Sequence, residues 1–220
     1  MNKKPYYQDN FVTLYHGDSR ELLPAFLKFD IVATDPPYGM QYQSRYRRKE
    51  DRKKAIAGDS FYDFEMLAVL KSLARSALYV FGRWDNLLKG FPSPKSVLVW
   101  DKGNHSMGDL EHEYGRRWEM CAFWPGEKHA WRGNRPVDVL SIARVNGNAL
   151  EHPTEKPVAL MGQLLSHSDG KTVLDPYAGG GSTLVAAKQL GLKATGVEIE
   201  EEYCELMVRR LQQEYFPFDE

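Results

Sequence analysis

The sequence predicts an α/β protein built on a mostly parallel, doubly wound sheet. Two observations predict it: short apolar runs alternate with amphipathic segments of helical length, and this alternation occurs in both halves of the chain. A third is a glycine-rich turn between an apolar run and a helical segment in the last third. With 220 residues, the chain is long enough for one domain with a small insertion.

The first elements expected are a strand and a helix. Residues 11–15 alternate in hydrophobicity and include β-branched side chains, which favours a strand. Asp18 and Glu21 have the spacing of a capping box, which predicts a helix over 21–28.

A second strand is predicted over the apolar run 30–34, and the prolines of the sequence Asp-Pro-Pro-Tyr at 35–38 forbid it to continue. This strand end suits the binding of a nucleobase amino group. The Asp35 carboxylate and the Pro36 carbonyl can accept its two N–H groups, and the Tyr38 ring can stack on the base. The alternative is a strand end at which the Asp caps a turn and the Tyr packs.

A basic segment follows at once. Residues 41–57 hold seven Lys or Arg and two acidic residues without apolar periodicity, so we expect a mobile basic loop over 40–58. The net charge of the chain is −1, and a local excess of positive charge in such a protein is typical of a surface that contacts a polyanion. An ordinary solvated surface run is the alternative.

The middle of the chain continues the alternation and then departs from it. Residues 61–75 are helical in pattern, and 77–81 and 96–100 are strand-like. Residues 101–148 are instead rich in Gly, His, Arg and Trp with short apolar runs, which indicates a small, irregular, partly β insertion.

The last third shows the clearest pattern of alternating helices and strands. The expected elements are a helix over 156–167 with Pro157 in its first turn, a strand over 171–174, a helix from the glycine-rich turn to 190, a strand over 193–197 and a helix over 201–212.

The glycine-rich turn and the acidic residue after the next strand, Glu198, are typical of a nucleotide-binding βαβ unit. A dinucleotide motif is not satisfied, because after Gly179 and Gly181 its third glycine would fall at Leu184. A phosphate-binding lysine is also missing from the turn. An adenosine ligand without phosphates, S-adenosylmethionine, fits better, and the alternative is a tight turn beside a charged strand end.

With both halves described, the chain resembles the permuted, β-group DNA amino-methyltransferases. The segments that carry the resemblance are Asp-Pro-Pro-Tyr at 35–38, Trp-Asp-Lys at 100–102, His-Pro-Thr-Glu-Lys-Pro at 152–157, Asp-Pro-Tyr-Ala-Gly-Gly-Gly-Ser-Thr at 175–183 and Gly-Val-Glu at 196–198. The resemblance implies a Rossmann-like methyltransferase fold in circularly permuted order, with 1–100 and 149–220 as catalytic domain and 101–148 as target-recognition insertion. The first strand should then lie beside the strand that ends at Glu198.

The resemblance also implies the site residues. The catalytic residues would be Asp35, Pro36, Pro37 and Tyr38. The residues that bind S-adenosylmethionine would be Asp18, Thr154, Lys156, Asp175, Tyr177, Gly179, Gly181, Ser182, Thr183 and Glu198. Those that contact double-stranded DNA would be Arg45, Arg47, Arg48, Lys49 and Lys53. For Asp18, the alternative is a helix N-cap.

The target base follows from the first residue of the catalytic motif. Members of the family that begin this motif with Asp tend to methylate adenine at N6, so Asp35 favours adenine. N4 of cytosine is the alternative, and a catalytically idle DNA-binding protein of the same fold is another. The sequence leaves open the recognition sequence, a homodimer and a restriction nuclease partner.

Composition excludes several other classes. The chain has two cysteines without a C-x-x-C spacing and six histidines without H-E-x-x-H spacing, so neither a disulfide framework nor a metal site is expected. Apolar runs are too short to span a bilayer, and the N-terminus lacks a signal-peptide core. We expect a protein of the cytoplasm of a bacterial or phage-infected cell.

Overall fold

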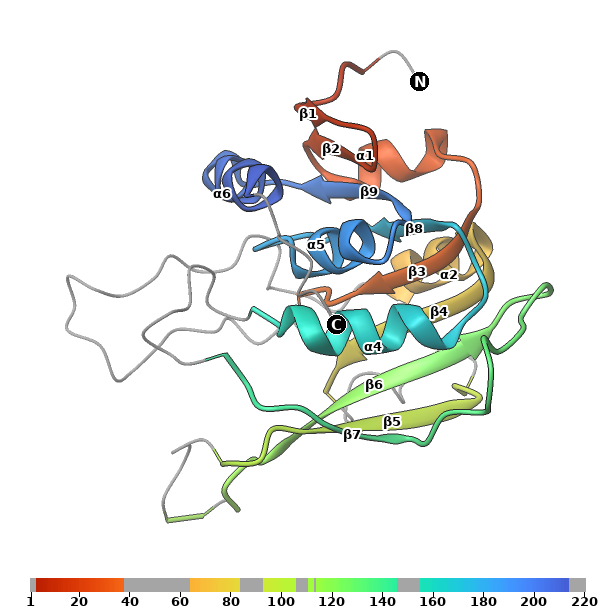
Figure 1. The fold of residues 1–220 in the computed structure, drawn as a ribbon, viewed down its shortest axis with the longest axis vertical. Helices are drawn as coiled ribbons and strands as arrows, with labels where there is room; N and C mark the ends of the chain where they lie inside the picture. The colour runs from red at the N-terminus through yellow and green to blue at the C-terminus, as the bar shows by residue number, and fades with distance from the viewer. Residues whose placement is uncertain are drawn as a thin grey trace, which may run out of the picture.

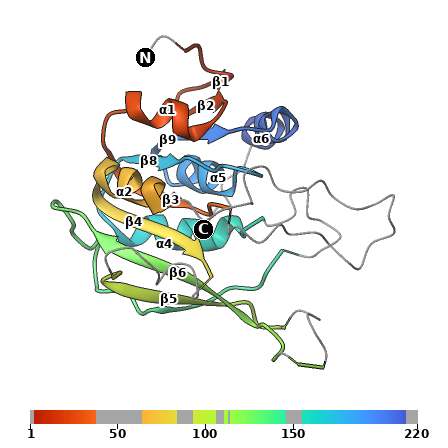
Figure 2. The ribbon, with the colours of Figure 1, turned by 180° about the vertical axis from the view of Figure 1, so that it is seen from behind.

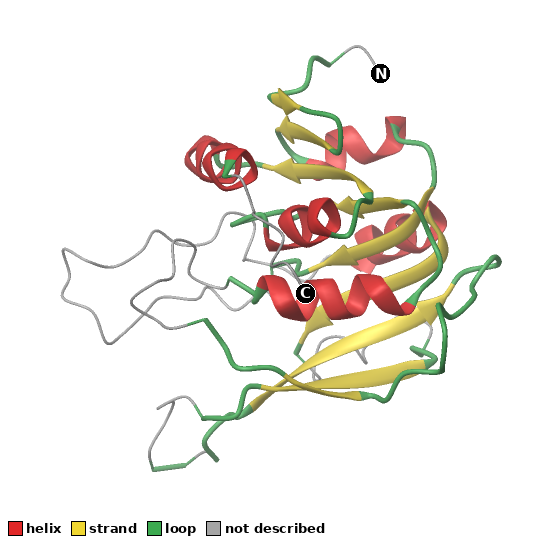
Figure 3. Cartoon of the chain, viewed as in Figure 1, coloured by secondary structure: helices red, strands yellow, loops and turns green. Residues whose placement is uncertain are grey.

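The computed structural model describes residues 3–37, 64–83, 93–105, 111–112, 114–145 and 155–213. In these ranges a nine-stranded sheet forms the centre of the molecule, with helices on both faces (Figure 1). The predicted α/β fold is confirmed. Figure 3 shows how strands and helices alternate.

The sheet combines a parallel centre with an antiparallel side. In spatial order its strands are β1 (Tyr7–Gln8), β2 (Val12–His16), β9 (Lys193–Glu198), β8 (Thr172–Asp175), β3 (Phe29–Thr34), β4 (Ala74–Gly82), β6 (Trp118–Pro125), β5 (Ser96–Asp101) and β7 (Val139–Ser141). All neighbours from β2 to β4 are parallel, whereas β6 is antiparallel to both β4 and β5.

The two ends of the chain complete one sheet, as predicted. β2 runs parallel to β9, with His16 opposite Glu198. Immediately after β2, the backbone N–H of Gly17 donates to the carbonyl of Glu198 over 2.8 Å. The permuted order therefore still places the N-terminal strand next to the strand that ends the glycine-rich βαβ unit.

Helices cover both faces. Their bounds are α1 (Ser19–Leu22), the 3-10 helix η1 (Leu23–Ala25), α2 (Phe64–Leu73), α4 (Val158–His167), α5 (Ser182–Gln189) and α6 (Glu201–Gln212). Figures 1 and 2, which view the molecule from opposite sides, place α4 and α5 on one face and α1 and α2 on the other.

Several predicted helix bounds were wrong. The helix expected over 61–75 ends at Leu73, and β4 begins at the next residue. The helix expected over 21–28 begins at Ser19 and changes to a 3-10 turn after Leu22, because Pro24 lacks the N–H that an α-helix requires there. Pro157 precedes α4 as its N-cap instead of lying in its first turn, and its carbonyl accepts from Leu160 N at 3.0 Å.

β3 is buried on both faces, which explains its unbroken apolar run. Ile31 and Ala33 pack in the core beneath α4 and α5, and Val32 packs in the core beneath α2. All three side chains are 0% exposed. The residue that follows β3, Asp35, therefore extends from one of the most constrained strands of the sheet.

Part of the 101–148 segment belongs to the sheet. β6 lies between β4 and β5, and Trp124 on it is buried. Trp131 packs on the ring of Phe123 with ring centroids 5.5 Å apart, and Trp118 is about half exposed. The assignment of this segment as a target-recognition insertion stays a prediction.

Within the described ranges, no helix is both long and apolar enough to cross a bilayer, and no cluster of three His, Cys, Asp or Glu side chains is placed to hold a metal. Cys121 and Cys204 are both buried free thiols.

Candidate active site

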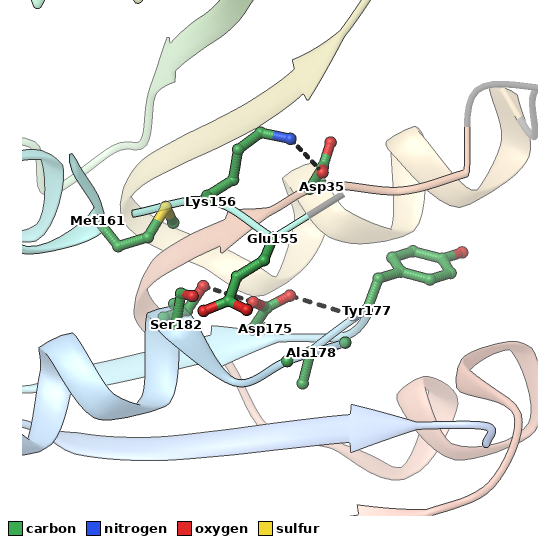
Figure 4. Close-up of a pocket in the computed structure, with 11 residues that line it drawn as sticks. Asp35, Glu155, Lys156, Met161, Asp175, Tyr177, Ala178 and Ser182 are labelled. Carbon is green, nitrogen blue, oxygen red and sulfur yellow. Dashed lines mark hydrogen bonds and ion pairs between the residues drawn. The ribbon is translucent and has the colours of Figure 1, made fainter. Parts of the chain in front are cut away.

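Two turns at the same edge of the sheet open into one pocket. Asp35 follows β3, and the glycine-rich turn follows β8, which pairs with β3. The pocket encloses about 390 Å³ of space, part of it open to solvent. It is lined by Asp35, Glu155, Lys156, Met161, Asp175, Tyr177, Ala178, Gly179, Gly180, Ser182 and Thr183 (Figure 4). Residues of the acidic turn and of the glycine-rich turn therefore line the same pocket.

A buried carboxylate joins the two turns. Asp175, 3% exposed, accepts at Oδ1 from the Thr34 hydroxyl over 2.8 Å and from Tyr177 N over 3.1 Å. Its Oδ2 accepts from the Thr183 hydroxyl over 2.5 Å. Thr34 immediately precedes Asp35, and Thr183 lies in the first turn of α5, directly after the glycine-rich turn. Because Asp175 bonds both hydroxyls, it fixes the distance between the acidic turn and the glycine-rich turn.

This burial has a consequence for the charge of Asp175. Desolvation raises its pKa to about 6, although the three hydrogen bonds lower it. The folded protein therefore binds a proton at Asp175 at pH values at which the unfolded chain has already released it. The contribution of Asp175 to stability is fully present below about pH 4 and is lost as the pH rises through about 6.

Asp175→Asn should remove this dependence, since an amide does not titrate. The free energy of unfolding of the wild type, relative to that of Asp175→Asn, should fall by about 2 kcal/mol between pH 4 and pH 7. Urea unfolding at a series of pH values measures this difference. A difference that is constant with pH would show that Asp175 is ionised in the folded protein over the whole range.

Asp30→Asn is the matched control, because its dependence on pH should have the opposite sign and lie below about pH 4, outside the range in which Asp175 titrates. Burial raises the pKa of Asp30, but hydrogen bonds from Lys171 N and from the N–H and hydroxyl of Thr172 lower it more, so the pKa lies below its ordinary value. Its contribution to stability is present at neutral pH and is lost as the pH falls.

The glycine-rich turn needs glycine at 181. Gly181 caps α5 with φ 82°, in the left-handed region, and an added Cβ would lie 2.6 Å from Cγ of Met207 on α6. The next residue, Ser182, lines the pocket, and its buried hydroxyl has no hydrogen-bond partner in the structure. A buried, unpaired hydroxyl at a pocket wall is suited to bond a ligand.

Glu198 is held against this turn. Its Oε2 accepts from Gly179 N over 2.8 Å and its Oε1 from Glu200 N over 2.9 Å. Burial raises the pKa of Glu198, and these backbone N–H groups oppose the rise. A carboxylate has about four acceptor positions, and backbone N–H groups of Gly179, Ile199 and Glu200 use three of them, so Glu198 can still accept from a ligand hydroxyl.

A chain of charged side chains begins at Asp35 and continues through Lys156 to Glu119 and Lys102. Lys156, 7% exposed, pairs with Oδ2 of Asp35 and lies 3.3 Å from Oε2 of Glu119 (Figure 4 shows the first pair). Lys102 lies 3.2 Å from Oε1 of the same glutamate. Burial lowers the pKa of Lys156, but the two carboxylates raise it by more, above its ordinary value. Sequence reasoning missed Glu119, which lies in the segment assigned to an irregular insertion.

A second ion pair lies next to the glycine-rich turn. Glu155 lines the pocket and pairs with Arg210 of α6 over 2.8 Å. The same guanidinium donates to the carbonyl of Gly180 in the glycine-rich turn. Arg210 was also missed, because no motif marks it.

The remaining predicted residues lie elsewhere or outside the described ranges. Asp18 caps α1 by accepting from Arg20 N over 2.9 Å, which agrees with the helix-cap interpretation, and it does not line the pocket. Pro36, Pro37, Gly181 and Glu198 are described but do not line the pocket either. Tyr38, Thr154, Arg45, Arg47, Arg48, Lys49 and Lys53 lie outside the described residues.

Known proteins share both the sequence pattern and the fold. Residues 100–209 match a family model, N6_N4_Mtase, described as DNA methylase. A putative methylase of Escherichia coli K12, YubD, is 32% identical over 83% of this chain and 81% of its own length. Type II methyltransferase M.ScaI of Streptomyces caespitosus is 27% identical over 96% of this chain and 84% of its own.

The crystal structure of the M1.HpyAVI–SAM complex is similar in fold. It superposes with a TM-score of 0.66 at 25% identity and covers 90% of this chain and 99% of its own.

Proposed function

The chain belongs to the N6/N4 family of DNA methylases, and from this premise we propose that it transfers the methyl group of S-adenosylmethionine to N6 of adenine in double-stranded DNA. The observation that carries the proposal is the shared pocket. The acidic turn at Asp35 and the glycine-rich turn at Gly179 line it together, and Asp175 holds the two at a fixed separation.

Asp35 has the chemistry to hold the target amino group. Its Oδ2 is paired with Lys156, and a carboxylate has about four acceptor positions, so it can also accept an amino hydrogen. The Pro36 carbonyl can accept the second hydrogen. An amino nitrogen becomes more positive as its new bond to carbon forms, and a fixed carboxylate beside it stabilises that charge. Asp35 is therefore proposed to orient the amine and to stabilise the positive charge that develops on its nitrogen.

The opposite side of the pocket fits S-adenosylmethionine. When bound, this cofactor supplies the methyl group from its sulfonium sulfur. Glycines in the turn allow close approach of a ligand to the backbone, Ser182 offers an unpaired buried hydroxyl, and Glu198 lies beside the turn for hydroxyl groups of a ribose. We assign Lys156, Tyr177, Gly179, Ser182 and Thr183, which line the pocket, to this ligand.

The grip on DNA is proposed from the charge pattern of the sequence. Residues 41–57 follow the acidic turn directly and carry an excess of positive charge, which suits contact with phosphates close to the flipped base. The assignment of Arg45, Arg47, Arg48, Lys49 and Lys53 to this contact stays a prediction.

Incubation of unmethylated genomic DNA with the protein and labelled S-adenosylmethionine, followed by digestion and mass spectrometry of the nucleosides, tests the proposal. We expect N6-methyladenine. N4-methylcytosine, the alternative within the same family, would overturn the choice of base but not the reaction. Absence of any methylated nucleoside, together with retained DNA binding, would favour the catalytically idle protein.

A further inference from the structure

Glu119 lies at the active-site edge of the sheet although it is distant in sequence from every motif. It is the second residue of β6, and β6 runs antiparallel to β4. The start of an antiparallel strand meets the carboxyl ends of the parallel strands, where ligands bind in open α/β sheets. Because of this strand direction Glu119 contacts Lys156, which in turn contacts Asp35.

The four side chains form a row of alternating charge: Asp35, Lys156, Glu119 and Lys102. Neighbouring charges in this row are in direct contact or lie 3.2 and 3.3 Å apart. The Lys156 ammonium also lies 5.1 Å from the ring centroid of Phe81, and its side chain is only 7% accessible, so its charge is shielded from water, although the Glu119 side chain is 34% accessible. Charges shielded in this way interact more strongly than they do at the surface.

Lys156 by itself would oppose the proposed reaction. A full positive charge in contact with Asp35 cancels the negative charge that the target nitrogen needs as its own positive charge develops. Glu119, which does not line the pocket, offsets that charge. With Glu119 present, Asp35, Lys156 and Glu119 together carry one net negative charge, and the positive charge of Lys102 lies at the far end of the row from Asp35.

From this arrangement, and resting on the proposed function, we infer that Glu119 is a positioning residue for methyl transfer. It neutralises and orients Lys156, so that Lys156 fixes Asp35 without cancelling its charge at the target amine. Glu119 itself touches neither the cofactor nor the base.

Glu119→Gln tests the inference, because it keeps the shape of the side chain and removes the charge. We expect kcat with DNA to fall about tenfold, with the affinity for S-adenosylmethionine, measured by calorimetry, unchanged within about twofold. Glu127→Gln is the matched control, since Glu127 is an exposed acid in the turn after the same strand. Equal kcat in Glu119→Gln and Glu127→Gln would overturn the inference.

A double variant separates charge balance from simple structural support. Lys156→Met with Glu119→Gln restores one net negative charge at Asp35, so its kcat at saturating cofactor should exceed that of Glu119→Gln at least about threefold. A merely structural role predicts that the second substitution lowers kcat further, which would overturn the inference. If Glu119→Gln does not fold, the double variant is compared with the wild type instead. A kcat of the double variant below about one hundredth of the wild-type value would then overturn the inference.

The protein without ligands provides a readout independent of turnover. The melting temperatures of Glu119→Gln, Lys156→Met and the double variant should be non-additive, with the double variant losing less than the sum of the two. Additive losses would show that the two side chains are not coupled. Failure of the proposed function is distinguishable, because the wild-type protein would then form no methylated nucleoside, or N4-methylcytosine in place of N6-methyladenine.

Discussion

Asp35→Ala should lower methyl transfer to DNA by about 10³-fold or more in kcat, while the affinity for S-adenosylmethionine changes by less than about threefold. The carboxylate is the group proposed to hold the amino hydrogens and to stabilise the charge of the amine. Apart from Lys156, the pocket residues assigned to the cofactor lie within 175–183, and Asp175 holds that segment in place. Single-turnover kinetics and calorimetry of cofactor binding measure the two quantities separately.

The substitution should leave the fold intact, because Lys156 keeps Glu119 as its partner when Asp35 is removed. Asp169→Ala is the control, since Asp169 is an exposed acid, with a side chain 72% accessible, that does not line the pocket. An Asp35→Ala protein with wild-type kcat would remove the acidic turn from the mechanism. A protein that loses cofactor binding as well would instead assign Asp35 to the integrity of the pocket.

Local pattern was sufficient to predict six of the nine strands, β2, β3, β4, β5, β8 and β9, and the two motif turns. The final helix was predicted over 201–212, and α6 has those bounds, because its apolar positions recur at helical spacing. The pairing of β2 with β9 was predicted from the order of the motifs. The error at α1 shows the limit of the same method, since the capping residues were recognised and the effect of Pro24 was overlooked.

Charged partners that come from distant segments could not be predicted. Glu119 is a single acid in a stretch without a motif, and only the antiparallel direction of β6 brings it to Lys156. Arg210 lies one helical turn after Leu206 and Met207, at the border of the buried face of α6, but periodicity does not say what a border residue contacts. Both contacts are made by tertiary packing, which a single sequence does not reveal.

Arg210→Met should destabilise the protein by about 3 kcal/mol and weaken S-adenosylmethionine binding about tenfold. The guanidinium is the partner of Glu155, whose side chain is only 7% accessible, and it also donates to the Gly180 carbonyl. Its loss leaves a carboxylate buried without a counter-charge and frees one side of the glycine-rich turn. Urea unfolding gives the stability, and calorimetry gives the cofactor affinity.

Two further variants identify the cause. Arg209→Met makes the same substitution at the neighbouring, exposed position of the same helix, so it should change both quantities little. Adding Glu155→Gln to Arg210→Met removes the stranded charge, and at least half of the lost stability should return. Cofactor affinity should stay low in the double variant, because Gly180 is still unbraced. If affinity returned together with stability, the effect of Arg210 on the pocket would be electrostatic through Glu155, and the contact with the glycine-rich turn would have no role of its own.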